Sequence, residues 1–467
     1  MGGFFGCAAN KACSKELFYG TDYLSHMGTK RGGLATFGKD GFQRTIHNLE
    51  NAYFRSKFEA DIDKLTGHMG IGVISDTDSQ PIIIHGPLGK FALVMVGRIV
   101  NLDELVKEAF DRNIHFSETS QGDINPTELV ATLICQASSF QEGILYAQNK
   151  IKGSCSMLVL TESGIFAGRD RLGRTPIVIG KRENAFAASS ESSVFSNLGF
   201  EVEYYLGPGE IIWMTPEGME QIQGPGEKMQ ICSFLWVYYG YPVSSYEGIN
   251  TEQVRYNCGA ALARNETKQA DLVAGIPDSG IGHAIGFANE SKIPYMRPYV
   301  KYTPTWPRSF MPQNQAMRDL VARMKLIPIR EIIQGKRIIF CDDSVVRGTQ
   351  LQDNTQILYE YGAKEVHMRI ACPCLIHPCE FLNFSTSRST LELAGRKAIY
   401  DLEGTEDIDL TEYAVDGSEK HRAMIEKIIH RLGLTSIRYQ KMEDLVAAIG
   451  LPKEKLCTHC WDNSSYF

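Results

Sequence analysis

An apolar stretch, two carboxylates and a short loop follow one another between Arg337 and Gln350. The residues Arg337–Cys341 predict a buried strand that runs directly into Asp342 and Asp343. Adjacent carboxylates can bind sugar hydroxyls or Mg²⁺, a cation that takes oxygen ligands from one or two carboxylates and from the phosphates of its substrate. The pair therefore indicates a site for a phosphorylated sugar that binds together with Mg²⁺.

The loop after this pair carries groups that can hold a phosphate. Gly348 permits close approach of the backbone, and the hydroxyls of Ser344 and Thr349 can donate hydrogen bonds. The N–H groups at the start of the following helix favour an anion at the same place. A strand-to-helix turn with a solvated acidic pair is the structural alternative. Because the whole string is present, we expect a phosphate site made of Ser344, Val345, Val346, Arg347, Gly348 and Thr349.

A second loop, Pro277–Gly280, follows the predicted strand Asp271–Ile276 and precedes a predicted helix. On its own it is an ordinary turn with a helix cap. Strands followed by helices recur up to Ile370, which predicts a parallel sheet, and such sheets bind ligands at the carboxyl ends of their strands. We therefore expect this loop to face the diphosphate and its metal through Asp278, Ser279 and Gly280. The expected Mg²⁺ site consists of Ser279, Asp342 and Asp343.

The string Asp342–Thr349 resembles the 5-phosphoribosyl 1-diphosphate (PRPP) signature of type I phosphoribosyltransferases. Over nearly its whole length, the chain also resembles the amidophosphoribosyltransferases, glutamine-dependent enzymes that make 5-phosphoribosylamine at the start of purine synthesis. The resemblance rests on motifs along the chain, namely Gly168–Gly173, Ser189–Ser192, Gly207–Glu210, Ile276–Gly280, Lys325–Arg330, the PRPP loop and Gly362–His367. We identify the chain as a member of the iron–sulfur branch with a degenerate glutaminase site.

This resemblance implies a class II glutamine amidotransferase-like domain, which is a four-layer αββα sandwich of the N-terminal-nucleophile (Ntn) hydrolase type. It also implies a type I phosphoribosyltransferase domain with a parallel sheet. The sequence pattern agrees with the first of these domains. Short β-rich runs up to Gln223 predict antiparallel sheet, with helices near Asn101–Arg112 and Pro126–Gln136. Two domains also suit 467 residues, and turn-rich Gln223–Lys228 marks a boundary. We expect domains at 1–225 and 226–430, and a C-terminal segment at 431–467 with a Cys-x-x-Cys motif.

Three features indicate that glutamine hydrolysis has been lost. The resemblance implies a cysteine at position 2, whose thiolate attacks the amide, but Gly2 stands there. Gly70 stands where the Gly-His-x-Arg segment of the family has the arginine that holds the glutamine carboxylate. Val96–Gly97 replaces an Asn-Gly pair that stabilises the oxyanion. Cys7 would lack the α-amine base, so we expect an inactive glutaminase site.

The family's mobile loop over PRPP resembles Lys301–Phe310 in this chain. Lys301 and Arg308 are cations able to neutralise the leaving diphosphate, which makes them the expected catalytic residues. The intervening Tyr302–Pro307 departs from the family pattern, and Ile327 stands where the family has asparagine. These departures affect the predicted identity of the acceptor more than the prediction that the chain binds PRPP.

The leading hypothesis is transfer of the phosphoribosyl group from PRPP·Mg²⁺ to ammonia, which is free or supplied by a partner protein. One alternative is a non-catalytic paralogue that binds PRPP or nucleotides and regulates an active amidotransferase. Another is a phosphoribosyltransferase with a different amine or base as acceptor. We also expect purine nucleotides as inhibitors and a homo-oligomeric assembly.

Twelve cysteines without a secretion signal favour packed thiols, metal ligation or catalysis over disulfides. One branch of the resembled family holds a [4Fe–4S] cluster through a cysteine early in the second domain, one after His-Pro, and a C-terminal Cys-x-x-Cys. The corresponding residues are Cys232, Cys379, Cys457 and Cys460. Four thiolates suit such a cluster, but they also suit a structural zinc ion.

The composition excludes several classes of protein. A net charge of −7, with no basic stripe, argues against nucleic-acid binding. No apolar run reaches membrane-spanning length, and the first residues do not form a secretion signal. We therefore expect a cytoplasmic protein with no membrane partner.

Overall fold

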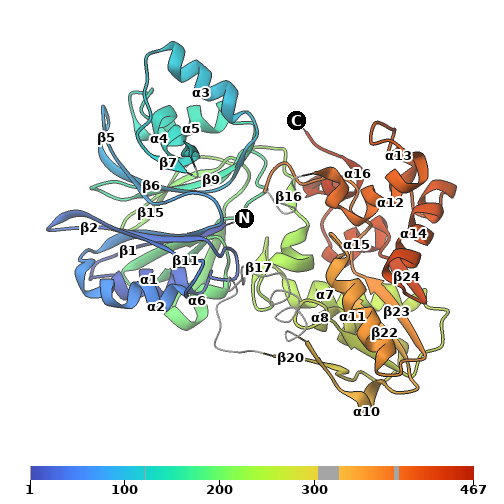
Figure 1. The fold of residues 1–467 in the computed structure, drawn as a ribbon. Coiled ribbons are helices and arrows are strands. Elements are labelled where there is room, and N and C mark those ends of the chain that lie inside the picture. The colour runs from blue at the N-terminus through green and yellow to red at the C-terminus, as the bar shows by residue number, and fades with distance from the viewer. Residues whose placement is uncertain (1, 121, 303–325, 383–388, 467) are drawn as a thin grey trace.

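The computed structural model describes residues 2–120, 122–302, 326–382 and 389–466. Two halves lie side by side, each with its own sheets and helices (Figure 1). The N-terminus lies at the edge of the first half that faces the second (Figure 1). The start of the chain therefore lies close to the boundary between the halves.

The first half contains two stacked sheets. One has seven strands in the order β13-β11-β12-β1-β4-β2-β3, and the other has six in the order β15-β14-β10-β9-β6-β5. The strands of the first are β1 (Gly2–Ala9), β2 (Arg31–Gly38), β3 (Gly41–Asn48), β4 (Met69–Ser75), β11 (Val178–Arg182), β12 (Ala185–Ser189) and β13 (Glu201–Tyr205). The strands of the second are β5 (Ile82–Gly86), β6 (Gly89–Ile99), β9 (Gly153–Leu160), β10 (Ile165–Gly168), β14 (Ile211–Met214) and β15 (Met219–Gln223).

Helices cover the outer faces of both sheets (Figure 1). The layer over the first sheet contains α1 (Ser14–Asp22), α2 (Phe54–Phe58) and α6 (Ser193–Leu198). The layer over the second contains α3 (Leu102–Asp111), α4 (Pro126–Ile134) and α5 (Phe140–Lys150). All the pairings within the two sheets are antiparallel. This arrangement confirms the predicted αββα sandwich.

Strand β1 shows why the sandwich needs two separate cores. Phe4 packs between the sheets, whereas its neighbour Phe5 packs under the helical layer, because successive side chains of a strand point to opposite faces. Small residues occupy the positions of β1 where the neighbouring layers approach closely. A Cβ at Gly6 would lie 2.8 Å from Leu158 of the facing sheet. The strand therefore consists of aromatic and very small residues and lacks an alternating polar pattern.

The second half is built on a parallel sheet, as the alternation of strands and helices predicts. Its strands β19, β22, β23 and β24 are neighbours in that order. They span Leu272–Gly275, Arg337–Asp342, Glu365–Ile370 and Ser436–Tyr439. The main helices around it are α7 (Thr251–Arg264), α8 (Ile281–Ser291), α11 (Thr349–Glu360), α12 (Ala394–Glu403), α14 (Glu419–Leu432) and α15 (Met442–Ile449).

Short elements connect these parts and pair at the edges. The short strands are β7 (Thr119–Ser120), β8 (Asp123–Ile124), β16 (Ile231–Cys232), β17 (Ser245–Tyr246), β18 (Ile249–Asn250), β20 (Tyr299–Lys301), β21 (Leu326–Pro328) and β25 (Leu456–Cys457). The short helices are η1 (Glu59–Lys64), η2 (Leu235–Tyr239), α10 (Arg330–Ile333), η3 (Thr390–Glu392), α13 (Thr411–Ala414), η4 (Lys453–Lys455) and α16 (His459–Asp462). The turn-rich segment Gln223–Lys228 falls between β15 and β16.

The buried carboxylate of Glu191 joins the two halves. It accepts hydrogen bonds from the hydroxyls of Ser244, at 2.9 Å, and Tyr246, at 2.5 Å, both in the second half. His26 of the first half lies 3.1 Å from the same carboxylate. A second buried contact pairs Arg169 with Glu247 at 2.8 Å. Polar contacts of two fully buried groups, Glu191 and Arg169, thus link the halves.

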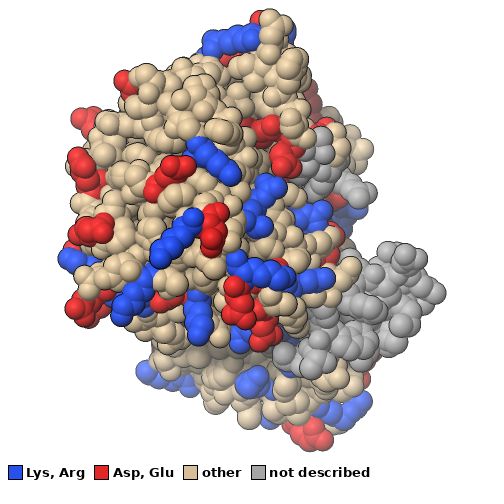
Figure 2. All heavy atoms as spheres, turned by 90° about the vertical axis from the view of Figure 1, so that its left-hand side faces the viewer, with Lys and Arg blue, Asp and Glu red and all other residues tan. Residues whose placement is uncertain are grey.

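The surface agrees with the charge balance of the sequence. Figure 2 shows one face of the molecule, on which Lys and Arg are mixed with Asp and Glu and do not form a basic stripe. Among the helices of the described residues, none is both long and apolar enough to cross a membrane.

Candidate functional site

The acidic pair lies at the carboxyl end of β22, where the parallel sheet presents its loops. Strand β19 pairs with β22, and Gly275 lies opposite Cys341 at their ends. The loop after β19 therefore comes beside the acidic pair, and the Ser279 hydroxyl donates a hydrogen bond to Asp342 at 3.0 Å. Gly280 packs so closely that a Cβ would lie 2.1 Å from the Cys341 carbonyl oxygen. The structure thus joins the two loops that the sequence singles out.

The two carboxylates share one small volume. Burial raises the pKa of Asp342 well above its ordinary value, and the charge of Asp343 raises it further. Asp343 itself is 5% exposed and accepts a hydrogen bond from the Ser344 hydroxyl at 2.6 Å. Two carboxylates that disfavour each other's ionisation fit a site completed by a cation, since a divalent ion removes the repulsion. The residues present therefore fit Mg²⁺.

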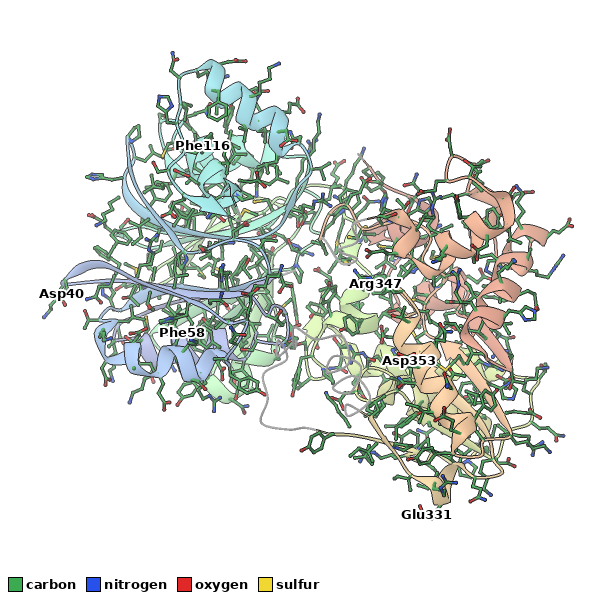
Figure 3. All side chains as sticks on the ribbon, viewed as in Figure 1. Asp40, Phe58, Phe116, Glu331, Arg347 and Asp353 are labelled. Carbon is green, nitrogen blue, oxygen red and sulfur yellow. The ribbon has the colours of Figure 1, made fainter. Side chains whose placement is uncertain are left out.

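The phosphate loop turns sharply into α11 at Gly348. This residue has φ +79°, a conformation that glycine adopts without strain. The Val346 carbonyl accepts a hydrogen bond from Ala394 N–H at 2.7 Å, which fixes the middle of the loop. Arg347 lies on the side of the second half that is nearer the first (Figure 3), and its guanidinium pairs with Glu392 at 2.7 Å. Glu392 was not foreseen from the sequence, because nothing in its neighbourhood marks it.

Lys301, at the end of β20, also has a carboxylate partner. Its ammonium group forms an ion pair with Asp278 of the first loop. This contact brings a predicted catalytic cation to a predicted PRPP-binding residue. Arg308 and the Tyr302–Pro307 segment beyond Tyr302 lie outside the described residues.

Arg255 of α7 interacts electrostatically with Asp343 of the acidic pair, and nothing in the sequence marks it for this role. Its guanidinium donates to the carbonyls of Trp236, Tyr238 and Gly240 at 3.1, 2.9 and 2.8 Å. Burial lowers the pKa of Arg255, although the charges of Glu252 and then Asp343 oppose this shift. A buried positive charge therefore lies close enough to interact with Asp343.

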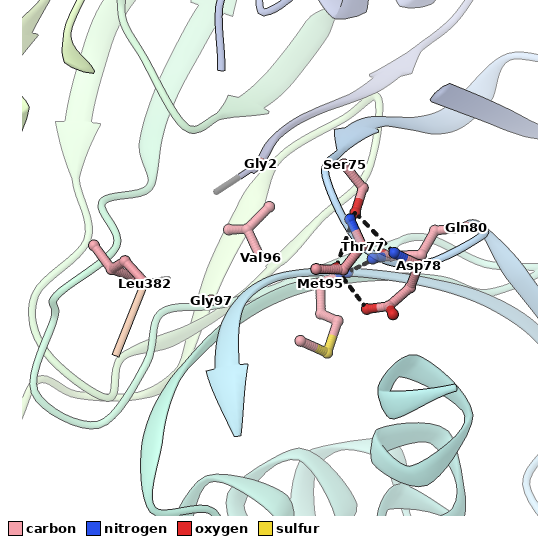
Figure 4. Close-up of a pocket in the computed structure, with 9 residues that line it drawn as sticks. All are labelled: Gly2, Ser75, Thr77, Asp78, Gln80, Met95, Val96, Gly97 and Leu382. Atoms are coloured by element: carbon pink, nitrogen blue, oxygen red, sulfur yellow. Dashed lines mark hydrogen bonds between the residues drawn. The ribbon is translucent and has the colours of Figure 1, made fainter. Parts of the chain in front are cut away.

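A cavity surrounds the start of β1 and is lined by residues of the first half and by Leu382 of the second (Figure 4). Its volume is about 20 Å³, which is room for about one water molecule. A Cβ at Gly2 would lie 2.6 Å from the carbonyl oxygen of Ile74. The cavity is lined by Gly2, Ser75, Thr77, Asp78, Gln80, Met95, Val96, Gly97 and Leu382. None of these lining residues is Lys or Arg.

The strand register shows where Gly70 lies relative to this cavity. Gly70 lies opposite Cys7 on β1, whereas Ser75 lies opposite Gly2. A Cβ at Gly70 would meet Leu17 of α1 at 2.7 Å, which is on the helical side of the sheet. Gly70, which stands at the position of the family's arginine in the sequence comparison, therefore does not line this cavity. Ser75 and Thr77 line it instead, together with Val96 and Gly97.

Four cysteines from three segments lie near one another in the second half. Cys232 and Cys457 are partners in the parallel pair β16–β25. The Cys460 carbonyl accepts a hydrogen bond from His377 N–H at 3.1 Å, and Leu382 N–H donates to Cys379 Sγ at 3.4 Å. The family resemblance stated above implied that these four cysteines lie together.

The thiols influence one another electrostatically. Burial raises the pKa of Cys232, and the charges of Cys457 and Cys379 add to the shift. The pKa of Cys460 is raised first by its hydrogen bond with Cys379 and then by burial. Across the described residues, no three His, Cys, Asp or Glu side chains converge as a site for one metal ion. The four thiols nevertheless lie close enough to interact with one another.

Comparisons with known proteins agree with this geometry. A family model described as a glutamine amidotransferase domain matches residues 68–197. An amidophosphoribosyltransferase of Methanocaldococcus jannaschii is 30% identical over 98% of this chain and 96% of its own length. One of Bacillus subtilis is 30% identical over 86% of this chain and 85% of its own.

A solved structure extends the likeness to three dimensions. The glutamine PRPP amidotransferase from B. subtilis, complexed with ADP and GMP, has a TM-score of 0.85 and 26% identity, and the match covers 99% of this chain and 97% of that one. Sequence and structure thus agree over both halves, and the chain belongs to the amidophosphoribosyltransferase family.

Proposed function

We propose that the chain transfers the phosphoribosyl group of PRPP to ammonia, giving 5-phosphoribosylamine and diphosphate. The observation that carries this proposal is the meeting of two loops, in which Ser279 donates to Asp342 at the ends of adjacent parallel strands. This arrangement presents hydroxyls, carboxylates and a helix start to one ligand. The family membership of the chain supports the same reaction.

Each side chain has one task in this proposal. Asp342 and Asp343 hold the ribose hydroxyls and Mg²⁺, together with Ser279. The 5-phosphate is held by Ser344, Val345, Val346, Arg347, Gly348 and Thr349. The diphosphate is held by Asp278, Ser279 and Gly280 through their loop, and Lys301 and Arg308 neutralise it as it leaves. When bound, Mg²⁺ neutralises charge on the diphosphate oxygens.

The reaction needs positioning and charge stabilisation more than covalent chemistry. The nitrogen lone pair of ammonia forms the new bond to ribose C1, and the C1–O bond to diphosphate breaks with its electron pair on oxygen. One ammonia proton is then lost to solvent or to the diphosphate. Lys301 exchanges Asp278 for the diphosphate as charge develops there, which stabilises the transition state electrostatically.

The N-terminal site, in this proposal, has lost glutamine hydrolysis while its sandwich remains. Gly2 offers no nucleophile, and the nearby Ile74 carbonyl leaves no room for a side chain on the present backbone. A cavity of about 20 Å³ is far smaller than a glutamine side chain requires. Ammonia would come from solution or from a partner protein.

The four cysteines are proposed to hold a [4Fe–4S] cluster. A single zinc ion needs thiolates around one point, at about 2.3 Å from the metal, whereas a cluster is larger and its ligands stand further apart. Four thiols contributed by three neighbouring segments supply the donor set that such a cluster takes. Iron and acid-labile sulfide in anaerobically purified protein would support the cluster, and zinc without either would contradict it.

Further features are carried over as proposals from the relatives. The B. subtilis enzyme was solved in complex with ADP and GMP, and we propose that purine nucleotides bind this chain as inhibitors. A homo-oligomer is proposed, with an amidotransferase-like domain at 1–225, a phosphoribosyltransferase domain at 226–430 and a C-terminal segment at 431–467.

The transferase proposal is tested by diphosphate release from PRPP and Mg²⁺ in the presence of an ammonium salt. Release that depends on ammonia supports the proposal. Binding of PRPP without release would contradict it in favour of a regulatory paralogue. Release with other amines, but not with ammonia, would assign a different acceptor.

A further inference from the structure

A buried arginine of the N-terminal half reaches the cysteine neighbourhood of the second half. Arg174 follows the motif Gly168–Gly173 and is 0% exposed. Its backbone N–H donates to Asp170 at 3.1 Å, and its guanidinium donates to the Gly153 carbonyl at 3.2 Å. These contacts fix the side chain to the N-terminal sandwich. Its charged end therefore has a defined position and direction.

The same guanidinium touches the three segments that carry the four cysteines. It donates to the Gln230 side chain at 2.9 Å and to the Ser465 hydroxyl at 3.1 Å. It also lies over the Phe381 ring, 3.8 Å from the ring centroid. Gln230 precedes Cys232, Phe381 follows Cys379, and Ser465 follows Cys460. One cation thus contacts each of the segments that converge on the thiols.

The contacts place this charge next to the segments that carry the four cysteines. Inside a protein, the attraction between opposite charges is much stronger than in water. A metal centre bound by four thiolates carries negative charge from its ligands, so a fixed guanidinium next to it stabilises it. The effect is larger in the reduced state, which carries one more negative charge.

We propose that Arg174 is a positioning and charge-compensating residue for the metal–thiolate centre of Cys232, Cys379, Cys457 and Cys460. Through it, the N-terminal domain sets the stability and reduction potential of a centre whose ligands all lie in the other half. The inference rests on the proposed cluster. It gives the inactive glutaminase domain a role that does not depend on glutamine.

The test compares full-length Arg174→Gln and Arg174→Lys with the wild-type protein, all purified anaerobically. R174Q removes the charge and is expected to lower the ratio of reduced to oxidised centre about tenfold at a fixed potential, or about 59 mV for a one-electron couple. R174K keeps a charge and is expected to shift the ratio less. Arg169→Gln is the matched control, because Arg169 is equally buried and lies in the preceding motif but pairs with Glu247.

A second readout is the rate at which a chelator bleaches the visible absorbance of the centre. This rate is expected to rise in R174Q and to stay near the wild-type value in R169Q. If R174Q does not fold, R174K and Arg169→Lys give the same comparison with a smaller shift. A wild-type protein without iron and sulfide overturns the proposed cluster and this inference with it. A cluster whose potential and bleaching rate are the same in the Arg174 and Arg169 variants overturns this inference alone.

Discussion

The cavity at Gly2 and the loops around Asp342 lie in the same chain but have very different contents. The cavity has room for about one water molecule and no cationic lining residue, whereas the loops bring together two carboxylates, a hydroxyl and an ion-paired lysine. Around the cavity, β1 remains paired with β4, and β6 remains paired with β9, along their lengths. Hydrophobic packing therefore maintains a fold independently of the few residues that perform chemistry on it.

The largest expected effect lies on the side of the acidic pair. Asp343→Asn removes a buried charge that the proposal assigns to ribose and Mg²⁺. We expect ammonia-dependent diphosphate release to fall by about 10²–10³-fold, since the lost interaction stabilises charge in the transition state. Asp353→Asn, at an exposed position of helix α11, is the control and should leave the rate unchanged. Equal rates in both variants would contradict the assignment.

The next effect concerns the buried carboxylate of Glu191, which joins the two halves that contain these regions. Glu191→Ala leaves Ser244, Tyr246 and His26 without their shared carboxylate, and we expect the free energy of unfolding to fall by about 3 kcal/mol. Glu203→Ala breaks an exposed pair and should change it by less than about 1 kcal/mol. Urea unfolding of both variants measures the difference. Similar values would show that the buried network does not hold the halves together.

The same carboxylate predicts a pH dependence. Burial tends to raise the pKa of Glu191, but its interactions with His26, Tyr246 and Ser244 hold it below the ordinary value. Its contribution to stability is therefore present above the pKa of an unfolded glutamate, about 4.3, and is lost as the pH falls through the lower folded value. Acid unfolding followed by tryptophan fluorescence should show this loss in the wild type and not in E191A.

A smaller effect is expected from the ion pair at the phosphate loop. Glu392→Gln releases Arg347 from a partly exposed partner. Because such pairs contribute up to about 1 kcal/mol, we expect the Kd for PRPP·Mg²⁺ to fall about threefold. Glu331→Gln, a control on α10 that Figure 3 labels far from this loop, should have no effect. A weaker affinity in E392Q would mean that Glu392 orients Arg347 for binding.

The smallest effect is predicted on the side of the cavity. Gly2→Cys restores a thiol but not the neighbouring groups, and its Cβ would lie 2.6 Å from a backbone oxygen. We expect no glutamine-dependent ammonia formation above background, measured as glutamate produced. Recovered hydrolysis in this single variant would remove the distinction between the two regions.

Elements with strong local patterns could be predicted from the sequence. The strands around Phe91–Ile99 and Arg337–Cys341 are rich in apolar residues, and α4 begins with Asn125 capping and Pro126 at its first position. Strand β1 escaped prediction because its small residues have weak strand propensity and are there to let two sheets approach. Its place depends on packing partners that are distant in sequence.

The candidate site could be predicted where a single loop contains it. The Asp342–Thr349 segment lies on one strand-to-helix turn, so its residues can be identified from the sequence as one candidate site. Glu392, Arg255 and Arg174 could not be, because their roles come from contacts between segments far apart in the chain. Whether Gly70 lines the cavity could not be predicted either, since a strand register cannot be read from a short motif alone.

The measurement that tests the central claim most directly is diphosphate release from PRPP and Mg²⁺ by anaerobically purified protein, with ammonia in one reaction and glutamine in another. A transferase with a silent glutaminase domain releases diphosphate with ammonia and not with glutamine. Release with both would contradict the loss of glutamine hydrolysis, and release with neither would contradict the transferase activity.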